Sequence, residues 1–187
     1  MKKLAVVILT SSVFLSGCVE TALVASAVTA VGAVNDPRSV GKQIDDSGIE
    51  VKATINLMKI DEISDNTNVS VTSYNGHVLV VGQAPNQALI DMVTDELKKI
   101  DQVVTIHNQM KIAPLATVGI KTKDTWITAK VKSELLSSDE VDGNTIKVVT
   151  ENQEVYLMGI VTPQQADVAA KLAAKVTDVK RVIKVFQ

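Results

Sequence analysis

Few residues in this chain have the types and spacing that catalysis or metal binding requires. The two histidines, His77 and His107, lie in segments with strand-like patterns, and neither has a cysteine or second histidine at metal-ligand spacing. We interpret both as solvent-facing strand residues. The acidic pairs Asp45-Asp46 and Asp61-Glu62 are typical of solvated loops or helix ends. The sequence has no Ser/His/Asp set and no glycine-rich phosphate loop, so it predicts no enzymatic activity, no metal and no cofactor that takes part in a reaction.

One segment instead carries residue types suited to a membrane surface. Ile127, Val131 and Leu135 follow the i, i+4, i+8 spacing of a core-facing helix stripe, and Trp126, the only tryptophan, falls on the other side. An exposed ring beside lysines fits the lipid–water boundary, where ammonium groups meet phosphates. The residues alone equally allow Trp126 to cover a seam between domains or to cap the core, because tryptophan is usually mostly buried. The other residues expected on or beside this outward side are Ala129, Lys130, Lys132, Ser133 and Leu136.

The single cysteine, Cys18, follows a short leader with a charged start and an apolar stretch, Leu4–Leu15, that is too short to span a bilayer. The sequence Leu15-Ser16-Gly17-Cys18 resembles the lipobox of bacterial lipoproteins. That resemblance implies cleavage after residue 17, and a diacylglycerol and an N-acyl chain on Cys18. Val19, in place of aspartate after the cysteine, implies sorting to the outer membrane.

Composition limits the partners of the remaining chain. Without Lys2 and Lys3 the formal charge falls from −2 to −4, which gives no basis for nucleic-acid binding. Aromatic residues make up only 3 % of the chain, so aliphatic side chains must form the core. Residues 18–44 are expected to be the lipidated N-terminus and a linker, with the small apolar segment 20–34 as a tether and a helix break around Pro37.

The chain then repeats itself at a period near 77 residues. The apolar pattern of Ile49–Met58 recurs in Ile127–Leu136, and the pair of strand-like segments ending at Gly82 recurs in the pair ending at Gly159. Both copies continue with a helix-like stretch and finish on a β-rich end. Two copies at so long a period indicate duplicated domains. We place them at residues 45–113 and 123–187, with residues 114–122 as a linker.

Each copy is expected to be an α+β unit of order αββαβ, with two helices on one face of a three-stranded mixed sheet. Val78 and Val80 alternate as in a half-buried strand after the turn Tyr74-Asn75-Gly76. The hairpin should be antiparallel and the strand–helix–strand connection parallel. In the second copy we expect a helix over Thr125–Ser137, with Asp124 or Thr125 as its N-cap. Each copy is small for an independent core, so the two should support each other.

The order of elements, the apolar pattern and the two glycines resemble the BON domain, a periplasmic module. Two such copies behind a lipobox resemble dual-BON lipoproteins of the outer membrane. This resemblance implies a non-enzymatic protein in the inner leaflet, facing the periplasm and enriched at the division site. It also implies binding of anionic phospholipid, mainly phosphatidylglycerol and also cardiolipin, through the first helix of the second domain, and a role in membrane integrity.

The charges of the two copies differ in a way that suits one-sided docking. Residues 45–112 hold five lysines against ten acidic residues, whereas residues 121–187 hold ten basic against nine acidic residues. An anionic surface would repel the first domain and tolerate the second. The alternative explanation of this charge difference is drift between the duplicated copies. The alternative functions are a protein adaptor that uses the Trp126 surface to bind an envelope protein, and a structural envelope protein whose two domains brace each other.

Overall fold

The structure is a computed structural model that describes residues 36–187 of the chain. These residues form one compact unit. The expected leader, Cys18 and the tether lie outside the described residues. Within residues 36–187, no helix combines the length and the apolar character that crossing a bilayer requires.

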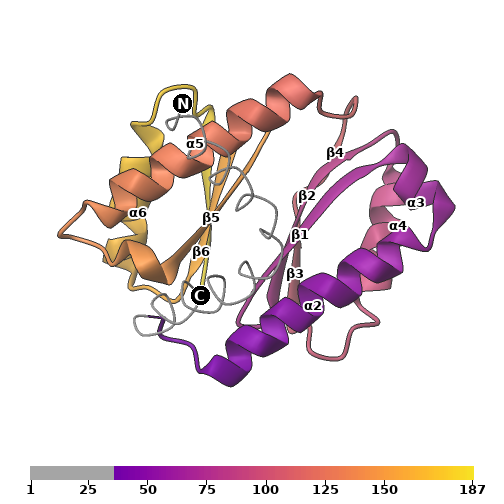
Figure 1. The fold of residues 1–187 in the computed structure, drawn as a ribbon, viewed down its shortest axis with the longest axis horizontal. Coiled ribbons are helices and arrows are strands. Elements are labelled where there is room, and N and C mark those ends of the chain that lie inside the picture. Colours follow the sequence, from indigo (N-terminus) through magenta and orange to yellow (C-terminus); the bar gives the residue numbers. More distant parts are fainter. Residues whose placement is uncertain (1–35) are drawn as a thin grey trace, which may run out of the picture. The chain divides into compact units, whose positions relative to one another are not determined.

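Two copies of a helix–hairpin–helix–strand unit follow each other along the chain (Figure 1). The first copy consists of α2 (Val40–Met58), α3 (Asp61–Asn66), β1 (Asn68–Tyr74), β2 (His77–Ala84), α4 (Gln87–Leu97), β3 (Thr105–Asn108) and β4 (Lys111–Ile112). The second copy consists of α5 (Val118–Leu136), the short 3-10 helix η1 (Gly143–Thr145), β5 (Ile146–Glu151), β6 (Glu154–Gly159), α6 (Pro163–Ala174) and β7 (Arg181–Phe186).

Each copy contains a mixed sheet. In the first, β1 pairs antiparallel with β2 and β2 pairs parallel with β3; in the second, β5 and β6 are antiparallel and β6 and β7 parallel. The predicted α+β class and strand directions are confirmed. The first sheet differs from the prediction by one short strand, β4, which also pairs parallel with β2, and the first copy contains the additional helix α3.

The first helix of each copy begins earlier than the sequence suggested. The side chains of Ser39 and Thr117 cap α2 and α5 by accepting hydrogen bonds from the backbone N–H groups of Lys42 and Ile120. Residues 40–44 and 118–122, which we expected to be linker, are therefore helical. The expectation of Asp124 or Thr125 as N-cap is wrong, because Thr117 supplies the cap seven positions before Asp124.

The helices of each copy cover one face of their own sheet. In the first copy Ile49, Ala53 and Leu57 of α2 pack with Val78 and Val80 of β2, and in the second copy α5 and α6 build an equivalent cluster. The apolar residues of α5 in that cluster are Ile127, Val131 and Leu135, the stripe that the sequence indicated.

A third apolar cluster joins the two sheets through the faces that the helices leave free. Its buried members are Tyr74, Leu79 and Val81 from the first copy, and Tyr156, Met158 and Val185 from the second. The described chain is thus layered as helices, sheet, sheet and helices. The prediction that β2 is half-buried is wrong, because Leu79 and Val81 are covered by the second sheet while Val78 and Val80 face the helices.

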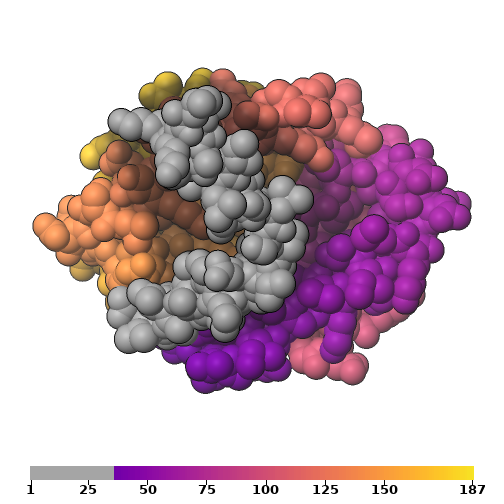
Figure 2. Space-filling model, in the orientation of Figure 1, coloured from indigo at the N-terminus to yellow at the C-terminus, as the bar shows by residue number. Residues whose placement is uncertain are grey.

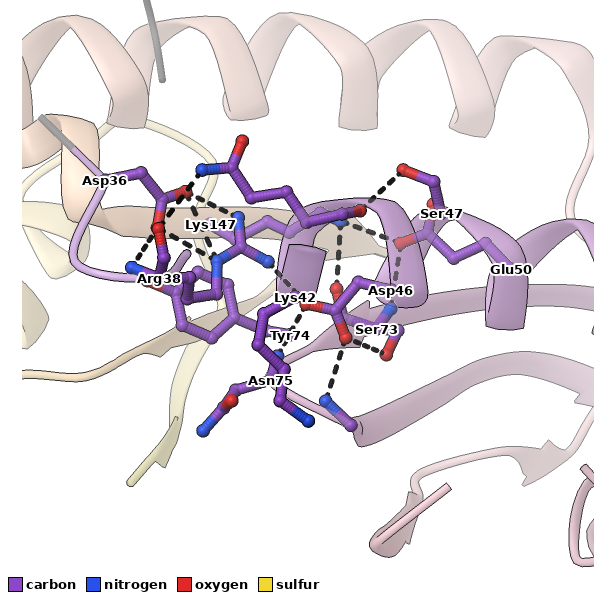
Figure 3. Close-up of polar contacts among 12 residues, drawn as sticks. Asp36, Arg38, Lys42, Asp46, Ser47, Glu50, Ser73, Tyr74, Asn75 and Lys147 are labelled. Atoms are coloured by element: carbon purple, nitrogen blue, oxygen red, sulfur yellow. Dashed lines mark hydrogen bonds and ion pairs between the residues drawn. The ribbon is translucent and has the colours of Figure 1, made fainter. Parts of the chain in front are cut away.

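Polar contacts also link the copies at the hairpin of the first one (Figure 3). Lys147 of β5 forms an ion pair with Glu50 at 2.7 Å and donates to the Ser73 carbonyl at 3.2 Å. The Tyr74 hydroxyl donates to the Thr145 carbonyl at 3.2 Å, and Gln187 Nε2 donates to the Tyr74 carbonyl at 2.9 Å. These contacts fix the end of β1 against the start of β5 and the end of β7.

Candidate functional site

The inward side of α5 is held firmly to the second sheet. Asp124 is buried, and its two carboxylate oxygens accept hydrogen bonds from the backbone N–H groups of Asn152 and Gln153 at 2.7 and 2.8 Å. Both turn residues have positive φ, 50° and 67°, so the carboxylate stabilises a turn that contains no glycine. One turn further along α5, the Thr128 hydroxyl donates to Thr150 of β5 at 2.7 Å. The helix is therefore a fixed platform.

The outward side of α5 carries apolar side chains that the rest of the described chain leaves exposed. Val118 is 80 % exposed, Trp126 45 % and Leu136 57 %. At about 100° per residue these three lie within one arc, opposite Ile127 and Val131. The small residues between them on this face, Thr122, Ala129 and Ser133, are also exposed. The result is a strip of three large apolar side chains along the outer face of the helix, separated by small residues of which Thr122 and Ser133 carry hydroxyl groups.

Lysines border this strip on both sides. By helix geometry Lys121 and Lys132 lie roughly 80–100° to one side of its centre, and Lys123 and Lys130 lie as far to the other. The Lys130 ammonium lies 5.7 Å from the centre of the Trp126 ring, which is within cation–π distance. Among the described residues, Lys121 donates to Asn68 at 2.7 Å and Lys123 pairs with Asp178 at 2.8 Å. Within residues 36–187, Lys130 and Lys132 form no hydrogen bond or ion pair, so their charges face solvent.

A polar groove of about 330 Å³ runs beside the Lys121 edge of α5. Burial raises the pKa of Glu151 in its wall, although the Gln83 side chain donates a hydrogen bond that opposes the shift. The lining is mainly polar and includes two carboxylates, Asp124 and Glu151, beside one ammonium group, so the groove does not suit acyl chains or anionic phosphate. The lining residues are Asn68, Val69, Ser70, Lys121, Asp124, Thr125, Thr128, Thr150 and Glu151.

The structure brings together the residues that the sequence singled out around Trp126. Ala129, Lys130, Lys132, Ser133 and Leu136 are all exposed on or beside the same face of α5. The interpretation of Trp126 as a residue that covers a domain seam is not supported, since it is 45 % exposed in the assembled pair of copies. Sequence reasoning missed Val118, Lys121 and Lys123, because it began the helix too late. The missed signal was Thr117, a good N-cap residue that lies seven positions before Asp124.

The histidines and acidic pairs that the sequence singled out do not form a common site. His77 and His107 are half-buried rather than solvent-facing, with stacked rings 6.0 Å apart, and burial together with His107 lowers the pKa of His77. Asp46, expected to be solvated, is buried, whereas Asp45, Asp61 and Glu62 are exposed. In the part of the chain that the structure describes, no three His, Cys, Asp or Glu side chains gather as metal ligands would.

Comparisons with known proteins agree with the duplicated architecture. The family model of the BON domain matches residues 45–114 and again residues 123–187. The outer membrane lipoprotein DolP of Haemophilus influenzae is 38 % identical over 187 residues, which cover 100 % of this chain and 96 % of that protein. A 21 kDa hemolysin of Actinobacillus pleuropneumoniae is 39 % identical over 151 residues, 81 % of this chain and 78 % of that protein.

Proposed function

The chain belongs to the BON domain family and is similar over its whole length to an outer-membrane lipoprotein, and from this premise we propose that it binds anionic phospholipid through the outward face of α5. The observation that carries the proposal is the exposed apolar strip of Val118, Trp126 and Leu136 between two rows of lysines. The apolar side chains of such a face suit the acyl region of a membrane, and its lysines suit the phosphate region.

The two components of the face have distinct roles. Trp126 and Leu136 enter the headgroup region, where an amphipathic ring is stabilised at the boundary between water and hydrocarbon. Lys130 and Lys132 each contribute about 1 kcal/mol of attraction to an anionic surface. An attraction of this size is reversible and falls with added salt.

Firm attachment belongs to the lipid anchor. Acyl chains on Cys18 contribute about 0.8 kcal/mol per buried methylene, far more than the α5 face. The protein is then a lipoprotein held in the inner leaflet of the outer membrane and facing the periplasm, and α5 senses which headgroups are present. We infer from the resemblance a preference for phosphatidylglycerol, with cardiolipin as a second ligand, enrichment at the division site and a role in membrane integrity.

Vesicle flotation of residues 36–187, which form a compact unit without the anchor, tests the proposal. The wild-type fragment should float with phosphatidylglycerol vesicles and not with phosphatidylcholine vesicles. Trp126→Glu should abolish flotation, because it places a negative charge in the strip. Val51→Glu, on the matching outward face of α2, is the control and should float as wild type does.

Two results would contradict the proposal. Equal flotation of Trp126→Glu and wild type would remove α5 from lipid binding. A photo-crosslinker at position 126 that yields protein adducts in cells, together with no flotation, would favour the alternative of an adaptor that binds an envelope protein through this face.

A further inference from the structure

The segment between the two copies exposes large apolar side chains next to the start of α5. Ile112, the last residue of β4, is 59 % exposed, Leu115 is 45 % exposed, and Val118, the first residue of α5, is 80 % exposed. Single exposed apolar residues are ordinary, but three within seven consecutive positions form a local apolar surface. In Figure 2 the start of α5, in salmon, lies at the molecular surface. Because Val118 belongs to both, this surface continues the strip of Trp126 and Leu136 beyond the helix.

The backbone of this linker has few N–H groups that need water. Pro114 has no N–H group at all. The Ala113 N–H donates to the Ala84 carbonyl at 3.2 Å, and the Ala116 N–H donates to the side-chain oxygen of Gln83 at 2.9 Å. An unpaired backbone N–H costs free energy wherever water is excluded. These bonds therefore lower the cost of moving the linker from water into the interface of a membrane.

The side chain of Gln83 also fixes the linker in position relative to both copies. Its oxygen accepts hydrogen bonds from the Ala116 N–H and from Asn68 of β1, at 2.9 and 3.1 Å. Its nitrogen donates to Glu151 of β5 in the second copy. One amide thus holds the linker, the first sheet and the second sheet together. Side chains presented from a segment that is already ordered lose less conformational entropy when they bind a ligand.

The charges along this segment permit contact with an anionic surface. Residues 102–123 hold three lysines and no acidic residue. The carboxylates that form ion pairs with this segment, Glu154 and Asp178, are held by Lys111 and Lys123 at 2.6 and 2.8 Å. Since each of these carboxylates has a cation beside it, the segment does not repel anionic headgroups. The apolar side chains supply the free energy of the contact, and the charges only allow it.

We propose that the linker, residues 112–117, enters the headgroup region of an anionic phospholipid bilayer together with α5, and that Ile112 and Leu115 extend the lipid-binding face. This inference rests on the proposed lipid binding by α5. A bilayer is the occupant because the linker surface is continuous with the α5 strip, and because its bonded N–H groups leave little main chain for a partner strand to pair with. Contacts from the linker at one end to Leu136 at the other hold α5 parallel to the membrane surface over its length of about 28 Å.

Titration of residues 36–187 with phosphatidylglycerol vesicles, followed by Trp126 fluorescence, tests this proposal. Leu115→Glu and Ile112→Glu should each raise the lipid concentration at half-maximal binding about fivefold, because each removes one apolar side chain from the interface. Leu115→Phe keeps an apolar side chain and should bind as tightly as wild type. Ile55→Glu is the matched control: it adds the same charge on the exposed apolar side of α2, at a position that is 48 % exposed, and should also bind as wild type does.

The outcomes distinguish a failure of this inference from a failure of lipid binding itself. If Trp126→Glu abolishes flotation while both linker glutamate variants bind as tightly as wild type, α5 binds lipid and the linker does not. If the wild-type fragment binds no phosphatidylglycerol vesicles, both proposals are wrong.

NMR with a spin-labelled lipid in phosphatidylglycerol bicelles provides a second measurement that needs no variant. The label should broaden the amide resonances of Ile112 and Leu115 as well as those of α5. Broadening confined to residues after Val118 would overturn the inference. A photo-crosslinker at position 115 that yields protein adducts in cells would identify a protein as the occupant, which would also overturn it.

Discussion

At the scale of single residues, the two copies share one device, a buried aspartate that ties the first helix to the hairpin turn. Asp46 accepts hydrogen bonds from the Ser73 hydroxyl and from the N–H groups of Asn75 and Gly76, at 2.7 to 2.8 Å. Asp124 does the same with the N–H groups of its own turn. Only Asp46 has a cation as well: Arg38 pairs with it at 2.6 Å and stacks 3.8 Å from the centre of the Tyr74 ring (Figure 3).

The difference between the two aspartates predicts different costs of substitution. Asp46→Asn removes one of the two carboxylate partners of Arg38, which keeps its ion pair with Asp36, and it replaces one acceptor oxygen with a donor beside the turn N–H groups. It should therefore lower the free energy of unfolding by about 2–4 kcal/mol. Asp124→Asn affects the two turn hydrogen bonds alone and should cost about 1–2 kcal/mol. Urea denaturation of residues 36–187 measures both. A larger loss for Asp124→Asn would show that Arg38 adds nothing to the first site.

Asp46 should also make the free energy of unfolding depend on pH. Burial by itself raises its pKa, but hydrogen bonds from Ser73, Gly76, Asn75 and Arg38 outweigh burial and hold the pKa below the ordinary value of 3.8. Since the pKa is lower in the folded state, the contribution of Asp46 is complete above about pH 5 and is lost as pH falls through the folded-state pKa. The difference in free energy of unfolding between wild type and Asp46→Asn should therefore become smaller below pH 4. Urea denaturation from pH 6 to pH 2.5 measures it. A difference that stays constant would mean that Asp46 is not ionised in the folded protein.

At the scale of elements, α2 and α5 are helices with two apolar faces, one buried and one exposed. The buried stripe could be predicted from spacing, because Ile127, Val131 and Leu135 repeat every four residues. The outward position of Trp126 followed from the same period. The helix start and the partner of Asp124 could not be predicted, because the carboxylate bonds to a turn 28 residues away in sequence, and local patterns do not show such contacts.

Substitution by alanine should have opposite effects on stability at two glycines. Gly82 of β2 has φ +135°, and a Cβ there would lie 1.7 Å from the Asn68 carbonyl oxygen, so Gly82→Ala should destabilise by roughly 3 kcal/mol or more. Gly48, inside α2, has open space around its Cβ position, so Gly48→Ala should stabilise by about 0.5–1 kcal/mol. Thermal unfolding followed by circular dichroism measures both. A neutral Gly82→Ala would mean that the β1–β2 hairpin can shift its register.

At the scale of the whole molecule, the sheet-to-sheet cluster makes one folding unit of two small domains. A copy of this size has a limited core of its own, and burial of Leu79, Tyr156 and Met158 between the sheets adds apolar surface that neither copy could bury alone. The sequence indicated that the two copies stabilise each other, but it did not indicate that the contact lies between the two sheets. The run Val78-Leu79-Val80-Val81 was the available sign, since four consecutive apolar residues in a strand indicate burial on both faces.

Coupling between the copies can be tested because the only tryptophan lies in the second one. Leu79→Ala, in the first copy, removes a fully buried side chain from the shared cluster and should cost about 2–5 kcal/mol. Because the sheets stabilise each other, we expect Trp126 fluorescence and far-UV circular dichroism to report one shared transition that moves to lower urea concentration. Leu97→Ala, in the separate core of the first copy, is the matched variant and should move the same transition. If the urea midpoint reported by Trp126 fluorescence stayed at its wild-type value in both variants, the second copy would fold independently of the first.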